Sequence, residues 1–204
     1  MITFKSTAVK KTNIDYNKAF VIEQLFADPK VIEMHVAKLK EVYKGASDAF
    51  IRNQVDNIII KENAFNSIMT YLVSCFEFKF DEEEIKSVQA KVKATMSQAN
   101  DQQTADLASK LVQKGLVFNE LEKENKIEVS DADAKSYLDQ YYKTTNNSIN
   151  QYLNNKEKFE EIKNIILEEK ITQWVINKFK VSITIQNILN RNVPMNEGQP
   201  TEQK

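Results

Sequence analysis

Helical spacing dominates the distribution of apolar residues along the chain. The longest periodic run places apolar side chains at intervals of three, four or seven residues: Ile51, Val55, Ile58, Phe65, Met69, Leu72 and Phe76. Beginning at a cap formed by Ser47 or Asp48, this run predicts a helix of about 30 residues, roughly 45 Å long. Most helices have only about 12 residues, so we expect something elongated to pack along it.

Shorter apolar runs and cap residues predict the remaining helices. Asp28 followed by Pro29 combines a cap residue with proline at the first helical position, and the helix it opens should end near Gly45. A short helix is expected before it, within residues 14–27. Later helices are expected after the caps Asp81 and Ser130, briefly from Ile149, and over residues 104–124 and 159–179.

Short apolar alternations separate several of these helices, at residues 76–80, 126–129 and 179–183. Residues 2–9 alternate in the same way and predict a short strand or extended lead-in. Extended joints of this kind change the direction of the chain without a glycine turn, and the chain has only three Gly and three Pro residues. The pattern therefore predicts an all-α fold: an elongated multi-helix body with helical arms and short extended joints.

Composition removes several classes of function. The chain carries 28 Lys and Arg against 29 Asp and Glu, and the only arginines are Arg52 and Arg191, so no nucleic-acid partner is expected. One His and one Cys are too few for a zinc site of ordinary ligand count. Adjacent glutamates on a helix point about 100 degrees apart and rarely share a site. We therefore expect no enzyme activity, no metal and no cofactor.

The sequence also indicates the cellular compartment in which the protein is expected. No segment contains 18 consecutive apolar residues, and the N-terminal residues lack the apolar core of a secretory signal. The single cysteine excludes an internal disulfide. We therefore expect a cytoplasmic protein without a membrane partner.

Aromatic residues provide the candidate contact sites. Tyr137, Tyr141, Tyr142 and Tyr152 cluster in and around one expected helical hairpin. They either pack between its two helices or form an amphipathic surface that holds apolar segments of a partner. A helical Met is more often a core residue than a binding residue. The candidate substrate-binding residues are Met96, Val117, Phe118, Tyr137, Tyr141, Tyr142 and Tyr152.

Two longer stretches resemble a known family. Residues 117–134 and 149–176 are similar to the C-terminal domain of bacterial trigger factor, including Leu167-Glu-Glu-Lys170 followed by Lys180-Val-Ser182. Residues 65–85 resemble the helix and joint that lead into the first arm of that domain. Asp81 and Glu82 stand where the family usually has a proline. The resemblance covers about residues 14–185.

The resemblance implies the domain organisation. Residues 1–13 resemble the end of the prolyl-isomerase domain of the family, whereas that domain itself and the ribosome-docking domain have no counterpart here. The helical chaperone domain would occupy residues 14–185, before a tail largely disordered at its end. Its expected parts are a body (14–80), a first arm (81–126) and a second arm (127–185), and the tail that follows the domain occupies residues 186–204.

The resemblance also implies a function, that of an ATP-independent chaperone module whose helical cradle holds nascent or unfolded polypeptides through exposed apolar patches. Ribosome binding would follow only if a parent protein supplied the missing N-terminal domain. One alternative is a helical scaffold that binds one specific partner, or forms a homodimer, along residues 48–78. A second is an extracytoplasmic chaperone of the SurA type, which has a related architecture but requires an export signal.

Overall fold

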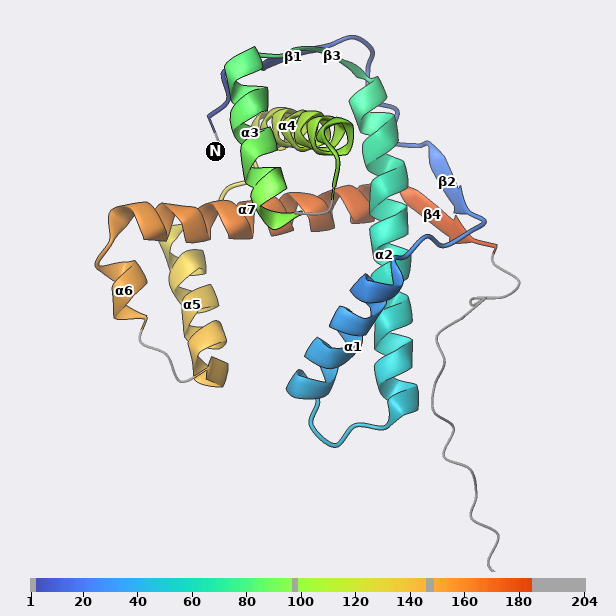
Figure 1. Cartoon of the computed structure of the whole chain (residues 1–204), viewed down its shortest axis with the longest axis vertical. Helices are drawn as coiled ribbons and strands as arrows, with labels where there is room; N and C mark the ends of the chain where they lie inside the picture. Colours follow the sequence, from blue (N-terminus) through green and yellow to red (C-terminus); the bar gives the residue numbers. More distant parts are fainter. Residues whose placement is uncertain (1–2, 97–98, 146–148, 185–204) are drawn as a thin grey trace, which may run out of the picture. The chain divides into compact units, whose positions relative to one another are not determined.

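The computed structural model describes residues 3–96, 99–145 and 149–184. Within them the chain is mostly helical, with short strand pairs, which confirms the all-α class (Figure 1). The elements, in chain order, are β1 (Thr7–Lys10), β2 (Ala19–Ile22), α1 (Pro29–Val42), α2 (Asp48–Ser74), β3 (Phe76–Lys79), α3 (Glu82–Thr95), α4 (Asp101–Asn125), α5 (Asp131–Thr145), α6 (Asn150–Leu153), α7 (Lys156–Lys178) and β4 (Lys180–Ile183).

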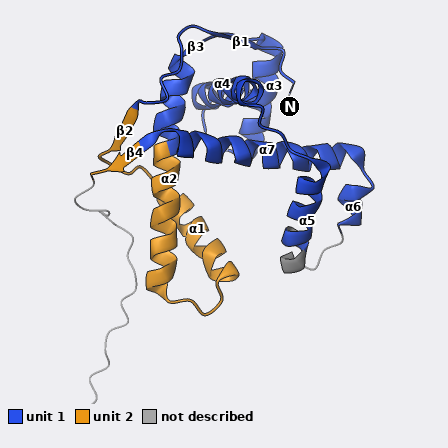
Figure 2. Cartoon of the chain, turned by 180° about the vertical axis from the view of Figure 1, so that it is seen from behind, with its two compact units in different colours: residues 1–18, 65–180 blue, residues 19–64, 181–204 orange. Residues whose placement is uncertain are grey.

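The chain divides into two compact units (Figure 2). Unit 1 contains residues 1–18 and 65–180, and unit 2 contains residues 19–64 and 181–204. Helix α2 contributes to both units. The body, arms and lead-in expected from the sequence follow different boundaries and stay a prediction. The expected tail, residues 186–204, lies outside the described residues.

Unit 2 is built on a hairpin of α1 and the N-terminal part of α2. The predicted cap forms, since the Asp28 side chain accepts a hydrogen bond from Lys30 N and Pro29 opens α1. Ser47 Oγ accepts from Phe50 N at the start of α2. The core of the hairpin consists of α2 residues packed against half-buried residues of α1 and its lead-in: Ile51, Val55 and Ile59 against Leu25, Ile32, Val36 and Leu39.

The short helix expected within residues 14–27 does not form, and strand β2 takes its place. Phe20 and Ile22 are buried whereas Ala19 and Val21 are exposed, so burial follows a period of two. Strand β2 pairs with β4, and beyond that pair Thr184 N donates to Ile22 O at 3.1 Å. The apolar residues at 20–26 fitted a helix by spacing, but a long-range strand partner determines their conformation.

In unit 1, an antiparallel β1–β3 pair lies next to α3 and α4 (Figure 1). Its register places Thr7 opposite Lys79 and Lys10 opposite Phe76. Asp81 caps α3 as expected, but Glu84 does not return to the cap. Both Glu84 carboxylate oxygens instead accept from the backbone N–H groups of Lys5 and Ser6, at 2.9 Å each. These bonds fasten the N-terminal segment to the start of α3.

Helices α5 and α6 pack against α7 (Figure 1). Ser130 caps α5, with Asp133 N donating to Ser130 Oγ and Ser130 N donating to Asp133 Oδ2. The joint expected at residues 126–129 is not a strand. Lys126 ends α4 there in the left-handed region, with φ of 51°, and an irregular segment leads to Ser130. The joints at 76–80 and 179–183 do contain strands, β3 and β4.

Candidate peptide-binding surfaces

The tip of the α1–α2 hairpin exposes apolar side chains. Tyr43 and Phe50 lie on either side of a turn at Gly45, with their rings edge to face and 5.3 Å apart. Val42 is exposed beside them. Lys40 Nζ lies 2.9 Å from Asp48 Oδ1, and a hydrogen bond from Lys40, together with its charge, lowers the pKa of Asp48. The turn therefore exposes an aromatic pair, and the ion pair between Lys40 and Asp48 joins the two helices beside it.

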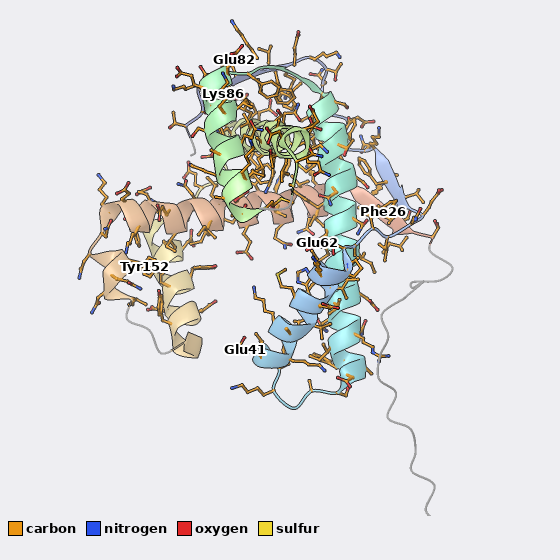
Figure 3. All side chains as sticks on the ribbon, in the orientation of Figure 1. Phe26, Glu41, Glu62, Glu82, Lys86 and Tyr152 are labelled. Carbon is orange, nitrogen blue, oxygen red and sulfur yellow. The ribbon has the colours of Figure 1, made fainter. Side chains whose placement is uncertain are left out.

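Phe26 is the most exposed large apolar side chain of the described residues, at 72%. It lies on the segment between β2 and α1 (Figure 3). Its backbone is nevertheless fixed, because the buried Asn63 accepts from Phe26 N at 2.8 Å and donates to Phe26 O at 2.9 Å. Asn63 also donates to Ile59 O. The buried side chain of Asn63 thus fixes the backbone at Phe26, and the apolar ring of Phe26 is exposed to solvent.

Unit 1 contains an apolar groove between α2 and α4, with a volume of about 520 Å³. We call it the α2/α4 groove. Apolar residues of both helices line it, namely Phe65, Met69 and Val73 of α2 and Leu107 and Leu111 of α4, with Asn66, Thr70, Lys110, Gln113 and Lys114 as the polar lining. Leu111 is 44% exposed. The groove is open and mostly apolar, which suits an apolar peptide segment.

The structure scatters the candidate residues named from the sequence. Met96 caps the C-terminal end of α3 and is 48% exposed. Val117 and Phe118 are 0% and 4% exposed. These two α4 residues therefore belong to the core in this structure and offer almost no surface to a partner.

The tyrosine cluster divides in a similar way. Tyr142 is buried and Tyr152 is half-buried, with ring centroids 5.8 Å apart. The labelled Tyr152 lies in the space between α5 and α6 (Figure 3). This contact matches the packing alternative for the cluster. Tyr137 is half-buried on α5, and the side chain of Tyr141 lies outside the described residues.

Ion pairs and a cap fix α5 against α7. Lys163 Nζ lies 2.9 Å from Asp131 Oδ1, and Lys170 Nζ lies 2.9 Å from Asp133 Oδ2. The hydrogen bond from Ser130 N, followed by that from Lys170, lowers the pKa of Asp133 to about 2. A hydrogen bond to Asp131 raises the pKa of Lys163. At neutral pH the carboxyl group of Asp133 and the amino group of Lys163 are therefore both charged.

Sequence reasoning missed Phe26, Val42, Phe50 and Leu111 as surface residues. Phe50 and Leu111 lie in apolar helical patterns, which ordinarily indicate core positions. Phe26 is two residues before a helix cap. Whether such a position is buried or exposed depends on how many other elements pack against it. The spacing of apolar residues along the sequence does not give that number.

In the described residues, the side chains of the types that bind metals or take part in catalysis do not gather at one site. Among the described residues no three His, Cys, Asp or Glu side chains group as metal ligands. His35 Nε2 lies 3.3 Å from Glu62 Oε1 in unit 2, and Cys75 is buried. Nor does any helix in the described ranges combine the length and apolarity that crossing a bilayer requires.

Comparisons with known proteins agree with this architecture. Residues 38–177 match the family described as bacterial trigger factor protein C-terminus, a chaperone-type family. The chain is 38% identical to the uncharacterized protein MG377 homolog of Mycoplasma pneumoniae, over 86% of this chain and 92% of that protein. Uncharacterized protein MG377 of Mycoplasma genitalium is 37% identical over the same shares.

A solved structure is similar as well. The crystal structure of the hypothetical Mycoplasma protein MPN555 matches with a TM-score of 0.79 and 35% identity, over 92% of this chain and 95% of that chain. The family match covers more than half of this chain, and the relatives match most of it. The chain therefore belongs to the family of the bacterial trigger factor C-terminal domain.

Proposed function

We propose that this protein is an ATP-independent chaperone that holds nascent or unfolded polypeptides in the cytoplasm. The observation that carries the proposal is the set of large apolar side chains left in solvent in both units, including Phe26, Val42, Phe50, Met96 and Leu111. Apolar side chains in water are available to bind apolar segments of a client. Membership of a chaperone-type family supports the same function.

The surroundings of these side chains suit a holding function. Charged residues make up 28% of the chain, which keeps it soluble although apolar groups are exposed. A protein that binds unfolded chains lowers the concentration of free chains that can aggregate, and this requires no nucleotide. The buried, unpaired thiol of Cys75 fits a reducing compartment.

The scaffold alternative requires the apolar positions along residues 48–78 to be available to another subunit. Ile51, Val55 and Ile59 are buried at 2–4% exposure, and α1 packs against them within the same unit. A homodimer along this part of α2 would first have to displace α1. We therefore prefer a chaperone whose contacts are the scattered exposed residues.

The test is light scattering from a chemically unfolded, aggregation-prone protein diluted into buffer without nucleotide. We expect suppression at a near-stoichiometric ratio. The variant Phe26→Gln/Val42→Gln/Leu111→Gln should suppress less, because it removes exposed apolar contacts from both units. Its matched control, Glu23→Gln/Lys38→Gln/Lys135→Gln, changes exposed charged residues and should suppress as well as the unmodified protein.

Alanine at Met96, Tyr137 and Tyr152 tests the contact residues expected from the sequence that keep some exposed surface. Weaker suppression by a folded variant would add them to the contact surface. A well-folded unmodified protein that leaves aggregation unchanged would refute the chaperone proposal. Equal suppression by the apolar variant and its control would refute the assignment of the contacts.

A further inference from the structure

We propose that the α2/α4 groove selects client segments in which an apolar stretch lies next to acidic residues. This inference rests on the proposed chaperone function and adds a substrate class to it. The groove lies within unit 1, between the C-terminal part of α2 and the middle of α4. Its residues are described throughout.

The floor of the groove provides the apolar half of the recognition. Phe65, Met69 and Val73 recur every four residues on α2, and Leu107 and Leu111 do so on α4, so each helix presents one apolar stripe to the groove. Phe65 also contacts Phe118 across the two helices, at a centroid distance of 6.2 Å. This contact joins the two helices near the groove, and Leu111 in the groove is exposed to solvent. An apolar client side chain placed over Leu111 would remove that surface from water.

The charged residues that line the groove provide the contact for the acidic residues of the client. Two lysines line the groove, and no Asp or Glu does. Lys114 is already neutralised, because its Nζ lies 2.6 Å from Glu168 Oε1 of α7 and 5.1 Å from the centre of the Phe118 ring. Lys110 lies one helical turn earlier, is exposed, and makes no ion pair with any described residue. A carboxylate of the client would supply that missing partner.

A second copy of the chain is the competing occupant. The described lining residues give no sign of self-complementarity, since the unpaired charge among them, that of Lys110, is positive. Like charges brought together in a symmetric dimer repel, whereas an acidic client complements them. We therefore assign the groove to a client segment, and sedimentation of the same samples tests for the dimer.

The experiment measures fluorescence anisotropy of rhodamine-labelled peptides that share one apolar core. The flanking residues are Glu, Gln or Lys. We expect the Glu-flanked peptide to bind about two- to fivefold more tightly than the Gln-flanked peptide at low salt, because exposed ion pairs have that strength. The Lys-flanked peptide should bind most weakly. Added salt should reduce the difference between the peptides, because it screens exposed charges.

Two variants assign the effect to the groove. Lys110→Glu should reverse the order of the Glu- and Lys-flanked peptides while leaving the Gln-flanked peptide nearly unchanged. Leu111→Gln should weaken all three peptides by about fivefold or more, since it removes an apolar contact. The matched controls are Lys135→Glu and Leu153→Gln, which change an exposed lysine and an exposed leucine of unit 1 outside the groove.

The outcomes separate this inference from the proposed function. Suppression of aggregation together with the expected peptide order supports both. Suppression with equal binding of the three peptides, or with no effect of the groove variants, overturns the groove assignment and leaves the chaperone function standing. Groove-dependent peptide binding without suppression overturns the chaperone function but retains the groove's specificity. A dimer that Lys110→Glu dissociates assigns the groove to a second copy and overturns the inference.

Discussion

Gly115 lies in the interior of α4, where the ring of Phe4 packs against it. A methyl group placed at Gly115 would lie 2.2 Å from Cζ and 2.8 Å from Cε2 of Phe4. Carbon atoms in contact are about 3.5–4.0 Å apart. Gly115→Ala therefore forces the ring to move by more than an ångström. Phe4 is half-buried, so its ring can move outward into solvent.

Two opposing effects determine the magnitude. Alanine is about 1 kcal/mol better than glycine in a helix interior. Displacing a half-buried phenylalanine ring loses about 1.5 kcal/mol of apolar burial. Gly115→Ala should therefore destabilise the natural protein by about 0.5 kcal/mol. In a Phe4→Ala background the ring is absent, and the same change should stabilise the protein by about 1 kcal/mol.

The decisive quantity is the coupling between the two positions, about 1.5 kcal/mol by this reasoning. It is measured as a double-mutant cycle from urea unfolding followed by circular dichroism at 222 nm, with all four proteins at one pH. Independent sites add to within about 0.5 kcal/mol. If Gly115→Ala stabilised both backgrounds equally, the contact between Phe4 and α4 would be refuted.

Two further predictions concern buried and charged partners. The pKa of Asp133 is lowered from 3.8 to about 2, so its stabilising contribution is complete above 3.8 and is lost as the pH falls towards 2. The urea midpoint of Asp133→Asn should therefore lie below that of the natural protein at pH 7, with a difference that shrinks as the pH falls below 4; a constant difference would contradict the pairing with Lys170 and the Ser130 cap. Asn63→Ala should lower the free energy of unfolding by about 2–3 kcal/mol, because it leaves the N–H and C=O groups of Phe26 without their partner. Asn66→Ala, at an exposed position of the same helix, is the control and should change stability by less than about 0.5 kcal/mol.

Local signals in the sequence accounted for the starts of α1, α2, α3 and α5, whereas α4 and α7 begin three residues before their expected positions. Asp28 with Pro29, Ser47, Asp81 and Ser130 each form the expected helix start, because a cap depends only on residues within one turn. The end of α4, unlike these helix starts, has no local signal in the sequence. Lys126 adopts a left-handed conformation that nothing in its residue type requires.

Strand β2 shows where local signals fail. Residues 19–22 fit either an irregular helix or a strand, and pairing with β4, more than 150 residues later in the chain, decides between them. The spacing of apolar residues does not encode which distant segment supplies the backbone hydrogen bonds. Glu84 is similar, since its carboxylate accepts from Lys5 and Ser6 instead of completing a local cap.

The sequence by itself determined the class of this protein and most of its helices, because periodicity and caps are local properties, and the resemblance of its longer stretches to trigger factor indicated its family. The tertiary structure alone decided which apolar residues reach solvent. Val117 and Phe118 are buried by the elements packed against them, whereas Leu111 on the same helix is exposed and borders an open groove. Identical helical spacing thus produces a core residue or a contact residue, and the difference is the presence of a packing partner.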